Sequence, residues 1–126
     1  MKRNEQASGG TAAIAAKAVE AALRGNELFR MAALPRRFRP VLFSRYSPGM
    51  SYDRHIDDAI MGRDDPVRSD ISVTLFFSEP DSYDGGELVI ENTSGEEVYK
   101  LPAGSVLLYP SNSLHRVEPV RAGERR

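Results

Sequence analysis

The chain has 126 residues, a length that suits one domain with a single hydrophobic core. Lysine and arginine number 17 against 18 acidic residues, so the net charge of −1 gives no long-range field that would attract nucleic acid or an anionic membrane. Cysteine is absent, which excludes disulfide scaffolds, iron–sulfur clusters, thiolate zinc sites and cysteine nucleophiles. Any metal site must therefore use nitrogen and oxygen ligands.

The N-terminus is polar, and no run of about 18 apolar residues occurs anywhere in the sequence. Both features argue against a signal peptide and a membrane span. Together with the balanced charge, they predict a cytoplasmic protein without a nucleic-acid or membrane partner.

Residues 11–34 are rich in alanine and leucine, with apolar residues at helical spacing and an interruption at Gly25 and Asn26. This pattern predicts two helices, the first of them capped by Thr11. Pro35 and Pro40 end the helical part, because proline disfavours helix at its own position and just before it. We therefore expect a helical segment over residues 1–37 that packs on a sheet formed by residues 38–126.

The rest of the chain contains segments rich in β-branched, aromatic or leucine residues, which favour strands. These segments are residues 41–46, 71–77, 87–91, 97–101, 105–109 and 114–120. Turn-forming residues separate nearly all of them, and no helix-length crossover lies between them for a parallel sheet. The sequence predicts a mainly β fold with N-terminal helices, in which the strands form a jelly roll (a double-stranded β-helix).

Histidine occurs only twice, at His55 and His115. Asp57 lies two residues after His55, so in extended backbone both side chains point to the same side of the chain. His115 follows Asp57 by 58 residues and can join them only if the sheet folds back, as it does in a jelly roll. Two histidines and one carboxylate on one face of a metal are the ligand set of non-haem Fe(II) oxygenases. The alternative is that either histidine is simply a surface or hydrogen-bonded residue.

Arg125 lies ten positions after His115, and the intervening Pro119 and Gly123 favour a turn that brings it back toward the site. Its planar guanidinium is suited to bidentate binding of a carboxylate. Arg121 and Arg126 lie close by, and spacing alone does not choose among the three arginines.

Tyr46 ends the first predicted strand. Its hydroxyl is a candidate hydrogen-bond partner for a bound carboxylate, but a strand tyrosine commonly packs in a core with its hydroxyl near water. Both interpretations stay open at the level of the sequence.

Two longer strings accompany these residues, Ser-Tyr-Asp-Gly-Gly-Glu-Leu at 82–88 and Tyr-Pro-Ser-Asn-Ser-Leu-His at 109–115. With the His-Ile-Asp string at 55–57, they resemble the bacterial PKHD-type hydroxylases, which are Fe(II)- and 2-oxoglutarate-dependent dioxygenases related to prolyl 4-hydroxylase. The resemblance is dense over residues 38–126 and looser over residues 11–35. It implies that His55, Asp57 and His115 are the iron ligands and that Arg125 binds 2-oxoglutarate.

The resemblance also implies an activity and its cofactors. A family member hydroxylates a substrate, here an unidentified small molecule or protein, with dioxygen while it decarboxylates 2-oxoglutarate to succinate and CO2. Fe(2+), 2-oxoglutarate and L-ascorbate are the expected cofactors.

Family members extend beyond both ends of this chain, so we expect a fragment whose jelly roll is incomplete at the C-terminus and whose exposed strand edges favour self-association. Two alternatives remain: a non-catalytic, cupin-like metal-binding jelly-roll module, and an inactive fragment of the enzyme. Tight binding of 2-oxoglutarate distinguishes the enzyme from the module, and monomeric stability with iron binding distinguishes it from the inactive fragment.

Overall fold

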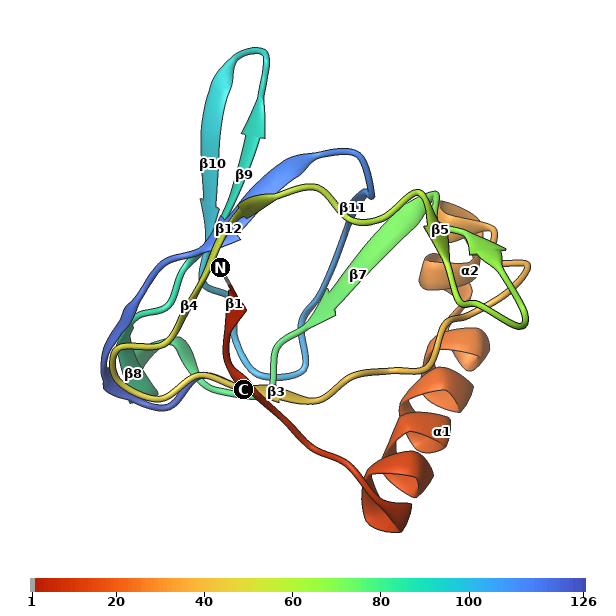
Figure 1. The fold of residues 1–126 in the computed structure, drawn as a ribbon, viewed down its shortest axis with the longest axis horizontal. Coiled ribbons are helices and arrows are strands. Elements are labelled where there is room, and N and C mark those ends of the chain that lie inside the picture. The colour runs from red at the N-terminus through yellow and green to blue at the C-terminus, as the bar shows by residue number, and fades with distance from the viewer. Residues whose placement is uncertain (1) are drawn as a thin grey trace.

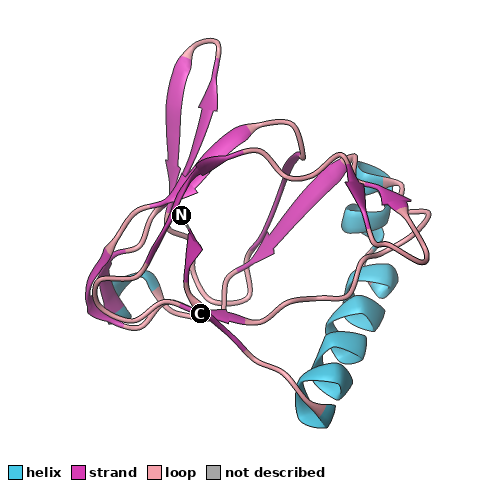
Figure 2. Cartoon of the chain, in the orientation of Figure 1, coloured by secondary structure: helices cyan, strands magenta, loops and turns pink. Residues whose placement is uncertain are grey.

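The structure is a computed structural model that describes residues 2–126. Its two α-helices, α1 (Gly10–Gly25) and α2 (Glu27–Ala33), lie beside a region built of strands and loops (Figures 1 and 2). A short 3-10 helix covers Pro80–Ser82. Asn26 separates α1 from α2 and caps α2, because its side chain accepts a hydrogen bond of 2.8 Å from the backbone N–H of Phe29. The predicted cap at Thr11 is wrong: α1 begins directly after Gly9, with no side-chain cap, and Thr11 lies inside the first turn. No helix of this described part is long and apolar enough to cross a membrane.

The strands are short, and all of their pairings are antiparallel. They are β1 (Lys2–Arg3), β2 (Glu5–Gln6), β3 (Ser44–Arg45), β4 (Ser51–His55), β5 (Ile60–Met61), β6 (Val67–Arg68), β7 (Ile71–Leu75), β8 (Tyr83–Gly85), β9 (Leu88–Asn92), β10 (Gly95–Tyr99), β11 (Val106–Pro110), β12 (Leu114–Val117) and β13 (Val120–Gly123).

Each of the six predicted strand segments overlaps an observed strand. The segment 114–120 is divided between β12 and β13, and the segment 41–46 retains only β3 and an isolated bridge at Tyr46. The sequence did not predict β1, β2, β4, β5, β6 or β8. Strands of two or three residues carry too little periodicity to be recognised, and β4 is largely polar.

The largest sheet has the order β1-β4-β12-β9-β10, and β7 pairs with β11 on the other side of the strand region (Figure 1). Two-stranded ladders β8–β13, β2–β3 and β5–β6 complete the pairing. The ladders do not join into one continuous barrel, which agrees with the expected incomplete jelly roll. The prediction of a mainly β fold with N-terminal helices is confirmed.

The hydrophobic core lies between the five-stranded sheet and the β7–β11 pair. Its buried residues come from β9, β11, β12, β13 and the segments before β4 and after β7: Tyr46, Phe76, Leu88, Ile90, Tyr109, Val117 and Val120. Gly85 lets β8 approach the chain beside β13, because a Cβ there would lie 2.1 Å from the carbonyl oxygen of Pro119. This close ladder leads directly into the segment that carries Arg125.

Candidate metal and cosubstrate site

The two histidines face each other across neighbouring strands. In the antiparallel pair β4–β12, His55 and His115 are direct partners in register, and their ring centroids lie 4.2 Å apart. Side chains at directly opposite positions of an antiparallel pair are close and lie on the same face of the sheet. The register of one strand pair therefore brings together residues that are 60 positions apart in the sequence.

A β-bulge adds an aromatic residue to this face. His115 and Val117 lie two residues apart on β12, but their partners on β4, His55 and Tyr52, are three residues apart. The extra residue on β4 turns Tyr52 to the same side as His55, where their rings stack with centroids 3.7 Å apart and an interplanar angle of 10°. Sequence analysis missed Tyr52, because a bulge has no signal in the pattern of β4.

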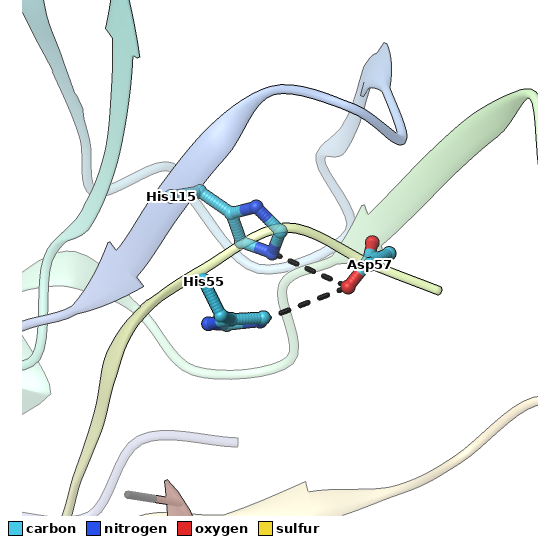
Figure 3. Close-up of side chains that lie close together, drawn as sticks. All are labelled: His55, Asp57 and His115. Atoms are coloured by element: carbon cyan, nitrogen blue, oxygen red, sulfur yellow. Dashed lines mark ion pairs between the residues drawn. The ribbon is translucent and has the colours of Figure 1, made fainter. Parts of the chain in front are cut away.

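Asp57 completes the group just beyond the end of β4. Its backbone N–H donates a 3.1 Å hydrogen bond to the carbonyl of Ser111, while Ile56 points away and is 56% exposed. One carboxylate oxygen, Oδ1, lies 3.7 Å from Nε2 of His55 and 3.6 Å from Nε2 of His115 (Figure 3). The structure thus brings together the three side chains that the sequence singled out, with ligand atoms all within 4.8 Å of one another.

Both imidazole rings are oriented by backbone carbonyls. Nδ1 of His55 lies 2.7 Å from the carbonyl of Asp53, and Nδ1 of His115 lies 2.9 Å from the carbonyl of Ser113. A carbonyl oxygen can only accept, so Nδ1 is the donor in each contact, and Nε2 is the ring nitrogen that faces Asp57. Ligand atoms about 2.1 Å from a metal stand roughly 3.0–3.5 Å apart. The two distances from Oδ1 to the histidine nitrogens exceed this spacing by a few tenths of an ångström, and the full set, within 4.8 Å, closes further around a bound ion. The three residues fit a divalent metal bound through two nitrogens and one oxygen.

Arg125 is held next to Tyr46. The two residues form an isolated bridge through reciprocal backbone hydrogen bonds of 2.8 and 2.9 Å. The guanidinium carbon of Arg125 lies 5.1 Å from the ring centre of Tyr46 and 5.6 Å from that of Phe76, and the residue is only 7% exposed. Within residues 2–126 no carboxylate forms an ion pair with it, and its Nε has no hydrogen-bond partner. A buried cation without a counter-charge is costly, so this position favours an anionic ligand.

The structure separates the three candidate arginines. Arg121 is exposed and pairs with Asp84 at 2.7 and 3.0 Å, and Arg126 is exposed and pairs with Glu124 at 3.0 Å. Only Arg125 of the three is buried and lacks an acidic partner among the described residues.

Tyr46 packs in the core. It is 3% exposed, and its hydroxyl accepts a 2.9 Å hydrogen bond from the side-chain amide of Asn4. Burial raises the pKa of Tyr46 above its usual value, opposed in part by the hydrogen bond from Asn4 and the positive charge of Arg125. The phenol therefore keeps its proton, which remains available to a further acceptor.

One cavity of about 1470 Å³ contains both groups: it is lined by His55, Asp57 and His115 and also by Tyr46 and Arg125. Polar and apolar residues alternate on β7, which also lines this cavity. Ser72 and Thr74 are half-buried and hydrogen-bond Asp57 and Tyr109, whereas Ile71 and Val73 are 41% and 38% exposed. Polar residues at every second position of an otherwise apolar strand were the available sequence signal for this polar wall, and sequence analysis did not use it.

Tyr109 of β11 belongs to the same wall. Its ring meets His115 edge-on with centroids 5.1 Å apart, its hydroxyl lies 3.2 Å from Oγ1 of Thr74, and burial raises its pKa to about 12. Tyr109 therefore stays neutral at physiological pH and contributes an apolar surface beside His115.

A jelly-roll frame that holds two histidines, one aspartate and a buried arginine around one cavity defines a class of protein. Residues 41–126 match the family model of the 2OG-Fe(II) oxygenase superfamily, and the chain belongs to this superfamily.

Among curated proteins, the chain is 57% identical over 108 residues to the PKHD-type hydroxylase Synpcc7942_0015 of Synechococcus elongatus, which covers 85% of this chain and 48% of that protein. It is 53% identical over 127 residues to a PKHD-type hydroxylase of Parvibaculum lavamentivorans, covering 100% of this chain and 57% of that protein. The chain spans about half the length of the curated relatives it matches. The resemblance to PKHD-type hydroxylases is confirmed.

Two solved structures share the fold. A prolyl-4-hydroxylase of Pseudomonas putida aligns with a TM-score of 0.67 and 28% identity, over 98% of this chain and 68% of that one. A 2OG-Fe(II) oxygenase family oxidoreductase of Burkholderia pseudomallei aligns with a TM-score of 0.65 and 21% identity, over 98% and 56%. These similarities confirm the predicted jelly-roll fold.

Proposed function

We propose that this chain carries the Fe(II)- and 2-oxoglutarate-binding core of a dioxygenase that hydroxylates an organic substrate and converts 2-oxoglutarate into succinate and CO2. The observation that supports this best is the convergence of His55, Asp57 and His115 within 4.8 Å in a cavity that also holds a buried arginine. Neither group alone distinguishes an oxygenase from a simple metal-binding module. Their combination matches the two binding needs of this chemistry, a metal and an anionic cosubstrate.

In this proposal, His55, Asp57 and His115 hold the metal on one face and leave the opposite positions open. Ferrous iron, when bound, supplies the one-electron and dioxygen chemistry that amino-acid side chains cannot perform. Ascorbate is the proposed reductant that keeps iron ferrous.

Arg125 then binds the distal carboxylate of 2-oxoglutarate through its planar guanidinium, and the phenolic O–H of Tyr46 donates a hydrogen bond to the same carboxylate. Burial of Arg125 strengthens this interaction, because the charges meet away from bulk water. The apolar surfaces of Leu88, Tyr109 and Val117, which also line the cavity, restrict water around the reacting groups.

The cytoplasmic location, the segment boundary at residue 37 and self-association stay predictions.

The test is an anaerobic titration of the 126-residue chain with Fe(II) and then with 2-oxoglutarate, followed by exposure to oxygen and measurement of succinate. We expect one equivalent of iron, cosubstrate binding that depends on iron, and slow succinate release without a substrate. Asp57→Ala is expected to abolish succinate formation, and Asp58→Ala, at an exposed neighbouring carboxylate, is the matched control. Iron binding without 2-oxoglutarate binding would instead favour the non-catalytic module, and binding of neither would favour an inactive fragment.

A further inference from the structure

We propose that Ser69, Ser111 and Ser72 form a directional hydrogen-bond relay that ends on Asp57 and restricts it to one ligand oxygen. The inference rests on the proposed metal site and concerns residues that no part of that proposal uses. Ser72 Oγ donates to Oδ2 of Asp57, Ser111 Oγ lies 3.0 Å from Ser72 Oγ, and Ser69 Oγ lies 2.8 Å from Ser111 Oγ. The other carboxylate oxygen, Oδ1, is the one near both histidines.

The three serines meet at one end of the β7–β11 pair. Ser72 lies on β7, where its partner in register is Tyr109, and Ser111 follows the end of β11. The backbone fixes this corner, because Ser111 donates from its N–H to Asp70 at 3.1 Å and accepts from the N–H of Asp57 at 3.1 Å. Both contacts use main-chain atoms, so a substitution of the Ser111 side chain leaves them in place.

The order of donors follows from counting protons. A metal-binding carboxylate is ionised and can only accept, so Ser72 must donate its single proton to Asp57. Ser72 then has no proton left for Ser111, and Ser111 must donate to Ser72. By the same reasoning Ser69 donates to Ser111, which is only 3% exposed and relies on protein partners for its hydroxyl. The chain of donation therefore runs in one direction, from Ser69 to Asp57.

This relay has a consequence for the open coordination positions. A carboxylate that rotates can bind a metal with both oxygens and so occupy a position needed by cosubstrate or dioxygen. The hydrogen bond from Ser72 holds Oδ2 on the serine side, and successive hydroxyl donors polarise one another in the same direction. Ser69, Ser111 and Ser72 are thus positioning residues, which act through Asp57 and do not themselves bind the metal.

The first experiment measures Co(II) binding to the 126-residue chain by its visible absorption, which reports both affinity and coordination geometry. Ser72→Ala is expected to weaken binding by about 10- to 100-fold, as is typical when a group that orients a metal ligand is lost, and to change the absorption spectrum. Ser72→Thr keeps the hydroxyl and should restore most of the affinity and the original spectrum. Ser94→Ala, in the exposed turn between β9 and β10, is the matched control and should change neither. Circular dichroism of the metal-free variants checks that each is folded.

The second experiment separates a relay from independent packing effects. Ser69→Ala is expected to weaken Co(II) binding in the wild-type background but to have no effect in the Ser72→Ala background, where the path to Asp57 is already broken. Ser111→Ala interrupts the relay at a second position. It should likewise weaken Co(II) binding in the wild-type background and have no effect in the Ser72→Ala background. Additive effects, or wild-type affinity and spectrum in Ser72→Ala, would overturn the relay. A wild-type chain that binds no Co(II) would instead overturn the metal site itself, so the two failures are distinguishable.

Discussion

The two ends of the cavity are held in opposite ways. At the metal end, each polar group has a partner before any ligand arrives: backbone carbonyls orient both imidazoles, and Ser72 holds the carboxylate. At the other end, Arg125 is fixed by one backbone bridge and two aromatic rings, and its buried charge has no acidic partner among residues 2–126. The metal end is a preorganised set of candidate ligands, whereas the arginine end is a desolvated cation that, in the proposed function, gains its counter-charge on binding the cosubstrate. Metal affinity should therefore depend on several residues, and cosubstrate affinity mainly on one.

The largest expected effect is at the metal end. Asp57→Ala should weaken Fe(II) binding by more than about 100-fold, because loss of a direct ligand costs more than loss of the groups that orient it. Anaerobic titration monitored by calorimetry gives the affinity. His55→Ala and His115→Ala should behave alike, and Asp58→Ala should match the wild type. The reverse result, with Asp58 needed and Asp57 dispensable, would contradict the arrangement of β4 and its loop.

A smaller effect, confined to the other end, is expected for Arg125→Ala. It should retain iron yet bind 2-oxoglutarate more weakly by about 2–3 kcal/mol, the size of a lost charge-assisted bidentate contact. Arg125→Lys should recover only part of this, since an ammonium offers a point charge and no planar fork. Equilibrium dialysis of 2-oxoglutarate in the presence of iron measures both. A loss of iron affinity equal to that of Asp57→Ala would show that the two ends are not separate.

Tyr46→Phe tests how much the hydroxyl of Tyr46, the residue beside Arg125, contributes to the stability of the fold. The hydroxyl accepts from Asn4, so its removal should lower the free energy of unfolding by about 1 kcal/mol. Burial raises the pKa of Tyr46, so its contribution to stability is complete below pH 10, the ordinary pKa of tyrosine, and is lost as the pH rises through the higher folded-state pKa. Urea unfolding at neutral and alkaline pH measures both effects. If the decline above pH 10 were as steep in Tyr46→Phe as in the wild type, Tyr46 would not be its source.

The smallest effect is expected for Arg121→Ala. This arginine is nearer to His115 in the sequence than Arg125 is, but it is exposed and already paired with Asp84. Its loss should leave 2-oxoglutarate affinity and unfolding midpoint unchanged within error. If Arg121→Ala weakened 2-oxoglutarate binding and Arg125→Ala left it unchanged, the carboxylate-binding role would belong to Arg121.

Local patterns in the sequence predicted most of the metal end. The alternation of an extended chain places His55 and Asp57 on one side of Ile56, and that relation needs no tertiary information. The resemblance carried by the strings at 82–88 and 109–115 then selected His115 and Arg125. Local patterns could not predict β4, whose residues are largely polar, nor the role of Ser72 and Ser111, which look like ordinary strand and turn residues.

By itself, the sequence determined the chemistry available to this protein. It offers nitrogen and oxygen ligands without thiolates, and it contains only two histidines, with Asp57 on the same side of the extended chain as His55. It also determined that the fold is mainly β. The tertiary structure alone decided which of these groups meet. The register of β4 and β12 set His55 opposite His115, the bulge turned Tyr52 onto the same face, and the bridge to Tyr46 buried Arg125 while Arg121 stayed in solvent. The physical reason is that register and burial depend on pairing between distant segments, and a change of one residue in register would move every side chain of a strand to its other face.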